Sequence, residues 1–173
     1  MTITRRVYVI GFMGSGKSTV SKKLASFLGW QIIDLDKEIE LKEGRSIKDI
    51  FSSSGEEHFR KLEAETLFNL KTSADTIIST GGGTPCYGNN MDFMIRTGIV
   101  VYLRMTPSQL KRRLEGKAAS RPLIRDISKA RLLQYITTKL SEREKYYLRA
   151  SIIVDSLDLD IKALGDLIRT RLA

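Results

Sequence analysis

Short apolar runs alternate along the chain with longer segments in which apolar residues recur every three or four positions. Five runs have the length and composition of buried strands: residues 7–10, 31–33, 76–79, 99–103 and 152–154. The longer segments show the spacing of helices that bury one face. Strands that alternate with helices are typical of a parallel sheet covered by helices. The pattern therefore predicts an α/β fold with a five-stranded parallel sheet flanked by helices on both faces.

The predicted helices have regular apolar faces. In the first helix this face consists of Val20, Leu24, Phe27 and Leu28. In the last two helices the faces consist of Leu133, Ile136, Leu140 and Tyr147, and of Ile161, Leu164, Ile168 and Leu172. We expect each of these faces to pack against the sheet.

Residues 115–127 form the one stretch without a clear period. A connection of about a dozen residues is long for a compact domain and favours a functional loop, which we interpret as a lid. Arg121 precedes Pro122 in this stretch, and a residue before proline is restricted to extended backbone. An arginine presented in this way is suited to closing over a transferring phosphoryl group.

The composition is that of an ordinary globular domain, with 173 residues of which 42% are hydrophobic and 28% are charged. Cys86 is the single cysteine, which excludes an internal disulfide. The longest apolar runs hold about five residues, far fewer than a membrane span needs. The first thirty residues have the pattern of a strand, a loop and a helix instead of a signal peptide. We expect a cytoplasmic protein that acts as a monomer without a membrane partner.

The chain is basic, because 29 lysines and arginines face 20 aspartates and glutamates and give a net charge of +9. No basic run is longer than three residues, and aromatic residues are not interleaved with the basic ones. Nucleic-acid binding is therefore disfavoured. Small anionic substrates are the partners that this charge favours.

Residues 11–18 follow the first predicted strand and fit the phosphate-binding pattern G-x-x-x-x-G-K-[ST]. Their three glycines let the backbone turn its N–H groups around phosphate oxygens, where Cβ atoms would obstruct the path. Lys17 can then reach the β- and γ-phosphates, and Ser18 can bind Mg²⁺. The pattern alone also fits a glycine-rich turn, but the strand before it and the amphipathic helix after it favour a phosphate site.

Two aspartates, Asp34 and Asp36, follow the second predicted strand, just before a helix that should begin near Lys37. Each could simply cap that helix. Ligands of such sheets, however, bind at the carboxyl ends of the strands, where both carboxylates lie. One carboxylate could hold a metal through water while the other orients or deprotonates an acceptor hydroxyl.

Three successive glycines, Gly81, Gly82 and Gly83, follow the third predicted strand. They suit a backbone that lies against a substrate or a γ-phosphate, although a flexible turn explains them equally well.

Two arginines occupy predicted helices. Arg60 should open a helix, and Glu63 one turn later could form an ordinary ion pair with it. Arg143 lies on the inward face of the penultimate helix, where a charge without a partner is costly. A carboxylate or a phosphate would be a suitable partner for Arg143. His58, the only histidine, is interpreted as an ordinary helix residue.

Taken together, six motifs stand in the order and spacing of one enzyme family. They are residues 11–18, Asp34-Leu-Asp36, residues 55–63 with Arg60 and Glu63, Gly81-Gly-Gly83, Arg121-Pro-Leu123, and Arg143 with Tyr147 on one helix. From about residue 5 to 155 the chain resembles the shikimate kinase family. The resemblance implies the nucleoside monophosphate kinase-like P-loop NTPase fold, with residues 1–173 as one domain, a substrate-binding segment at about residues 34–62 and a lid at about 112–125. It also implies transfer of the ATP γ-phosphate to the 3-hydroxyl of shikimate, a step of chorismate and aromatic amino-acid biosynthesis.

On the nucleotide side, the resemblance implies that ATP contacts Gly14, Ser15, Gly16, Lys17, Ser18, Thr19, Arg113 and Arg121. It further implies that Mg²⁺ is held by Ser18 and, through water, by Asp34. Arg113 matches the position near adenine. One departure is the acidic stretch Asp155-Ser-Leu-Asp158, where many family members have a basic residue that helps to cover adenine.

On the acceptor side, the resemblance implies that shikimate contacts Asp36, Arg60, Gly81, Gly82, Gly83 and Arg143. The two arginines would hold its carboxylate, and Asp36 would hold its hydroxyls. Lys17, Asp36 and Arg121 would be the catalytic residues. Whether Asp36 acts as a base or only orients the acceptor stays open.

Three other functions compete with this interpretation. A gluconate-type kinase of the same fold would need hydroxyl-reading groups more than two arginines. A nucleotide-binding regulatory module would lack Lys17, Asp36 or the lid arginine, and none of these is lacking. A basic nucleic-acid binder would be retained on heparin at moderate salt.

Overall fold

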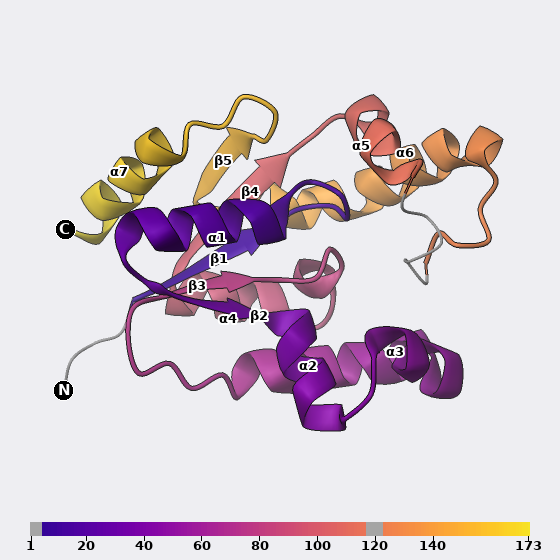
Figure 1. Cartoon of the computed structure of the whole chain (residues 1–173), viewed down its shortest axis with the longest axis horizontal. Helices are drawn as coiled ribbons and strands as arrows, with labels where there is room; N and C mark the ends of the chain where they lie inside the picture. The colour runs from indigo at the N-terminus through magenta and orange to yellow at the C-terminus, as the bar shows by residue number, and fades with distance from the viewer. Residues whose placement is uncertain (1–4, 117–122) are drawn as a thin grey trace.

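The computed structural model describes residues 5–116 and 123–173, and its centre is a parallel sheet (Figure 1). The strands are β1 Arg6–Ile10, β2 Gln31–Asp34, β3 Thr76–Ser79, β4 Ile99–Arg104 and β5 Ile152–Asp155. Their order across the sheet is β2-β3-β1-β4-β5, and every pairing is parallel. The predicted five-stranded α/β fold is confirmed, and each predicted strand is present.

Helices connect the strands. Within the described residues they are α1 Lys17–Leu28, α2 Leu35–Glu43, α3 Ile47–Phe68, α4 Asn90–Thr97, α5 Pro107–Leu114, α6 Lys129–Tyr147 and α7 Ile161–Leu172, with a 3₁₀ turn η1 at Thr84–Cys86. In Figure 1, α2 and α3 lie at the bottom, whereas α5 and α6 lie at the upper right.

The sheet separates two hydrophobic cores. Along β1, Val7 and Val9 face the core that α1 and α7 complete, and Tyr8 and Ile10 face the larger core under the other helices. The alternation follows from the period of two of a strand. Because both faces are covered, the strand is apolar throughout, as is typical of a buried parallel sheet.

The chain order brings three loops to one edge of the sheet. The chain first builds β1, β2 and β3 on one side and then crosses β1 to add β4 and β5. All strands are parallel, so the loops that follow β1, β2 and β3 lie at the same edge. Ligands in such sheets bind at this edge, beside the strand where the order reverses.

Two helix predictions need correction. Arg60 does not open a helix, because α3 begins at Ile47 and is interrupted only at Gly55, whose φ of 78° and ψ of 175° break the helical path. Arg60 therefore lies one turn into the second part of α3. On α6, Leu133 is exposed and the neighbouring Leu132 is buried in its place.

None of the helices in the described residues is long and apolar enough to cross a membrane. Of the predicted lid, residues 112–114 belong to α5. Arg121 and Pro122 lie outside the described residues.

Candidate functional site

The loop after β1 has the backbone of a phosphate cradle. Gly11, Gly14 and Gly16 adopt φ values of 150°, 83° and 93°, in the region that other residues avoid. Gly16 is the left-handed N-cap of α1, so the first N–H groups of that helix face the loop. A helix N-terminus of this kind carries partial positive charge and favours an anion.

Lys17 begins α1 and lies along the loop. Its Nζ donates to the carbonyl oxygens of Gly11 at 2.9 Å and of Phe12 at 3.1 Å. Ser15 is fully buried, and its carbonyl oxygen accepts a 2.6 Å hydrogen bond from Ser156 Oγ, which follows β5. The acidic stretch at residues 155–158 is thus attached through Ser156 to residues 11–18, which we call the P-loop.

A cavity of about 640 Å³ opens over this loop, and we call it the phosphate cavity. Nine of its eleven lining residues were predicted from the sequence to contact a ligand. The lining residues are Met13, Gly14, Gly16, Lys17, Ser18, Thr19, Asp36, Thr80, Gly81, Gly82 and Arg113. The structure therefore brings the P-loop, Asp36, two of the three glycines and Arg113 to one space.

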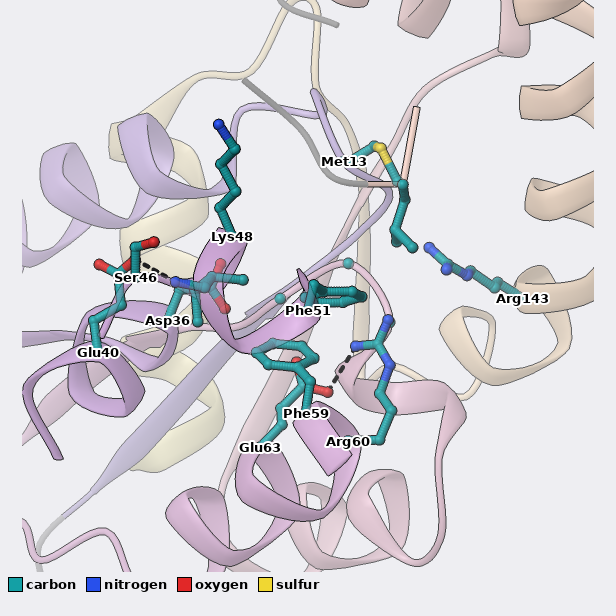
Figure 2. A pocket seen from close by; sticks show the side chains of 15 residues that line it. Met13, Asp36, Glu40, Ser46, Lys48, Phe51, Phe59, Arg60, Glu63 and Arg143 are labelled. Carbon is teal, nitrogen blue, oxygen red and sulfur yellow. Dashed lines mark hydrogen bonds and ion pairs between the residues drawn. The ribbon is translucent and has the colours of Figure 1, made fainter. Parts of the chain in front are cut away.

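A second cavity of about 290 Å³ adjoins the first, and we call it the acceptor cavity (Figure 2). Met13, Asp36, Gly81 and Gly82 line both cavities. The second cavity also contains Arg60, Glu63, Gly83 and Arg143, together with the aromatic rings of Phe51 and Phe59. A molecule bound here would lie directly beside a phosphate bound in the other cavity.

The three successive glycines are required by space. A Cβ at Gly81 would lie 2.6 Å from Glu63 Oε1, and one at Gly83 would lie 2.6 Å from Arg60 Nη2. Such distances are too short for real atoms, so a side chain at either position would displace the buried ion pair of Arg60 and Glu63. Close approach is therefore a better explanation of these glycines than a flexible turn.

Arg60 is held by two carboxylates. Its Nη1 donates to Glu63 Oε2 at 2.9 Å, and its Nη2 donates to Glu56 Oε1 at 3.0 Å. Burial opposes the charged form of Arg60, but the charge and hydrogen bonds of Glu63 together with the hydrogen bond to Glu56 outweigh burial and raise the pKa of the guanidinium above its usual value. The predicted ion pair with Glu63 is present, and Glu56 is an additional partner.

Arg143 enters the acceptor cavity from α6, on the side opposite Asp36 in Figure 2. The residue is buried, and its guanidinium lies 5.4 Å from the centre of the Phe12 ring. Its buried Nη1 has no hydrogen-bond partner among the described residues. A buried cation with an unused donor is costly, so this geometry favours an anion in the cavity.

Asp36 lies where the two cavities meet, in the first turn of α2. Burial, with the nearby carboxylates of Glu63 and Asp34, raises its pKa from 3.8 to about 6, against the opposing effect of Lys17. Its buried Oδ1 accepts no hydrogen bond within residues 5–116 and 123–173. A carboxylate with these properties can accept a proton or a hydrogen bond from a hydroxyl group near neutral pH.

Asp34 is at the N-cap position of α2, but its side chain makes no capping hydrogen bond. Simple helix capping therefore does not explain this carboxylate. Asp34 ends β2 and Ser18 lies in the first turn of α1, so both are at the same edge of the sheet, and their oxygens suit a hard divalent cation.

The comparisons with known proteins agree with this geometry. A family model described as shikimate kinase matches residues 13–169. The chain belongs to the shikimate kinase family. A relative named shikimate kinase from Parabacteroides distasonis is 40% identical over 152 residues, which cover 88% of each chain.

Two solved structures extend the likeness to three dimensions. The shikimate kinase of Bacteroides thetaiotaomicron is 34% identical, with a TM-score of 0.86 over 97% of this chain and 98% of that one. The shikimate kinase of Acinetobacter baumannii, solved in complex with shikimate, is 30% identical, with a TM-score of 0.85 over 98% of this chain and 93% of that one. The resemblance proposed from the sequence motifs is confirmed at the level of family and fold.

Several residues of this site were not predicted from the sequence. Glu56 stands four residues before Arg60, which is helical pairing distance, so the sequence carried a signal for it. Thr84, which donates to Glu63 Oε1 at 2.5 Å, and Met13, which lines both cavities, carried none. Arg121 was predicted to close on the phosphates and lies outside the described residues.

Proposed function

We propose that the chain transfers the γ-phosphoryl group of ATP to the 3-hydroxyl of shikimate, giving shikimate 3-phosphate and ADP. The observation that carries this proposal is the pair of adjoining cavities, one over the P-loop and one with two buried arginines, which share Asp36, Gly81 and Gly82. The reaction is a step of chorismate and aromatic amino-acid biosynthesis.

The acceptor cavity supports a substrate that carries a carboxylate. Arg60 and Arg143 come from α3 and α6, and both side chains are buried. Arg60 already balances Glu56 and Glu63, whereas Arg143 keeps a donor for the ligand. Charge-assisted hydrogen bonds from two guanidinium groups favour a carboxylate over a neutral sugar. Phe51 and Phe59 give the cavity an apolar wall for the ring of the acceptor.

In the mechanism that follows, Asp36 accepts a hydrogen bond from the 3-hydroxyl and aims its oxygen at the γ-phosphorus. Its raised pKa suits it to take the proton as the new oxygen–phosphorus bond forms and the bond from the γ-phosphorus to the bridging oxygen breaks, with ADP as the leaving group. Lys17 and the N–H groups of the P-loop offset the charge on the transferring group. Arg113 of α5 and the backbone of residues 11–18 bind the nucleotide, and Arg121 completes the site from the lid.

The metal that fits these residues is Mg²⁺. We assign Ser18 and, through water, Asp34 as its protein ligands, because Mg²⁺ in phosphoryl-transfer sites keeps few protein oxygens beside phosphates and water. When bound, the ion neutralises charge on the β- and γ-phosphates. The protein is expected to act as a cytoplasmic monomer without nucleic-acid or membrane partners, with residues 34–62 as the acceptor-binding segment and residues 112–125 as the lid.

The proposed function is tested by a coupled assay of ADP release. Shikimate, gluconate and nucleoside monophosphates are supplied in turn with ATP and Mg²⁺. We expect ADP release only with shikimate, together with formation of shikimate 3-phosphate. Faster turnover with gluconate or a nucleoside monophosphate would replace this function with that of another small-molecule kinase.

A further inference from the structure

Buried hydroxyl groups hold both ends of the glycine segment, residues 80–84. At the first end, the hydroxyl and the N–H of Thr80 both donate to the carbonyl oxygen of Val9 at 3.2 Å. At the other end, Thr84 donates to Glu63 on α3. The segment is therefore fixed to β1 and to α3 before any substrate binds.

A third hydroxyl reaches the middle of the segment. Tyr147, the last residue of α6, donates a 2.5 Å hydrogen bond to the carbonyl oxygen of Gly82. Tyr147 is fully buried, and its ring lies 5.0 Å from the ring of Tyr102. Burial raises the pKa of this hydroxyl far above its ordinary value, so the group remains a donor throughout the usable pH range.

Gly82 also touches the P-loop. A Cβ at this position would lie 3.0 Å from the amide nitrogen of Met13 and 3.4 Å from the carbonyl oxygen of Gly11. The Gly82 backbone thus fills the space between the P-loop and Tyr147. A shift of this backbone would change the wall that both cavities share.

Arg143 and Tyr147 are four residues apart on α6, so they lie on the same face of the helix. One turn of α6 therefore carries Arg143, which has an unused donor in the acceptor cavity, and the Tyr147 hydroxyl, which binds the Gly82 backbone in the wall that both cavities share. This arrangement ties the position of the acceptor to the position of the P-loop.

We propose that Tyr147 is a positioning residue that sets the distance between the bound acceptor and the transferring phosphoryl group, acting through the backbone of Gly82. The inference rests on the proposed function and adds a role for a residue that lines neither of the two cavities. Because a misplacement of about 1 Å can cost about 100-fold in rate, loss of one hydrogen bond here should affect turnover more than binding.

The test compares Tyr147→Phe with Tyr102→Phe. Both variants lose one hydroxyl from the same pair of stacked rings, but only the first loses the bond to Gly82. In Tyr147→Phe we expect kcat to fall about 10- to 100-fold at saturating shikimate and ATP. Dissociation constants for shikimate and for a non-hydrolysable ATP analogue, measured by calorimetry, should change less than about threefold. Tyr102→Phe should keep the parent kcat.

Either of two results would overturn the inference: a kcat for Tyr147→Phe within about threefold of the parent, or an equal loss in Tyr102→Phe. If Tyr147→Phe does not fold, Gly82→Ala serves instead, because its Cβ would press on Met13 while Tyr147 stays in place. An unchanged kcat in that variant would also overturn it. A parent chain that does not phosphorylate shikimate would refute the proposed function, whereas an active parent with an equally active Tyr147→Phe would refute only the positioning role.

Discussion

The phosphate cavity and the acceptor cavity are built in different ways. The first is made largely from consecutive backbone, in which glycines with positive φ and the first turn of α1 surround the space. The second is made from side chains that α2, α3 and α6 carry in from distant parts of the sequence. Phosphate binding is therefore a local property of this chain, whereas acceptor binding is a property of the whole fold. Changes in the first cavity should therefore act on turnover, and changes in the second on acceptor affinity.

Asp36 lines both cavities, so its substitution should have the largest effect on activity and should not be confined to either turnover or acceptor affinity. Asp36→Asn preserves size and hydrogen bonding but removes basicity, and we expect kcat to fall by about 10²–10⁴. Steady-state kinetics with saturating shikimate would measure the change. Glu38→Gln, on the same helix α2, is the matched control and should keep the parent rate.

The pH dependence sharpens the same prediction. Since the pKa of Asp36 is about 6, kcat/KM of the parent should fall below pH 6 as the carboxylate becomes protonated. This acidic limb should be absent in Asp36→Asn. A loss of less than about tenfold in kcat, with the acidic limb retained, would leave Asp36 as an orienting group only.

Lys17 tests the phosphate side of the comparison. Lys17→Ala should lower kcat by about 10²–10³, the scale of removing one preorganised electrostatic group, while shikimate affinity is retained. Lys22→Ala, an exposed lysine farther along α1, is the control. Near-normal turnover of Lys17→Ala would show that the loop backbone alone stabilises the transferring group.

Arg143 tests the acceptor side, with a smaller expected effect. Arg143→Ala should weaken shikimate binding by about 1.5–3 kcal/mol, the range for hydrogen bonds to charged groups, and leave the affinity for an ATP analogue unchanged. Calorimetric titration measures both affinities, and Arg149→Ala, a surface arginine paired with Asp92, is the control. If Arg143→Ala binds shikimate with the parent affinity, then Arg143 does not hold the carboxylate as proposed.

Arg60 provides a contrast with Arg143, because removing Arg60 should also lower the stability of the fold. Arg60→Ala leaves the fully buried Glu63 without its charged partner and, among the described residues, with only the hydrogen bond from Thr84, so the variant should lose stability as well as shikimate affinity. Thermal unfolding of both variants separates the two effects. Equal losses of stability would mean that Arg143 also has a structural partner of comparable weight.

The same contrast explains what the sequence could reveal. The strands, the P-loop and α1 follow from local patterns, and the structure has them where those patterns predict. Local patterns suggested Asp36, the three glycines and Arg143 one by one, but only the resemblance placed them in one acceptor site with Arg60, because no local signal brings α3 and α6 together. Arg60 was misplaced at a helix start, because α3 already begins at Ile47 and resumes directly after the break at Gly55. The hydrogen bond between Tyr147 and Gly82 joins positions 65 residues apart, and no local sequence pattern predicts it.

The raised pKa of Asp36 means that the folded protein binds this proton more tightly than the unfolded chain does. Below the ordinary value of 3.8 the group is protonated whether the chain is folded or unfolded, so it has no effect. Between pH 3.8 and about 6 the unfolded chain releases this proton while the folded chain keeps it, so the folded state is increasingly destabilised over that range. Above about pH 6 the destabilisation levels off, at about 3 kcal/mol by pH 8. Asp36→Asn should therefore unfold at higher denaturant concentration than the parent at pH 8 and lose that advantage at pH 4. A library of variants of this protein that is selected for heat resistance alone should accumulate neutral residues at position 36, and the selected variants should lose kinase activity.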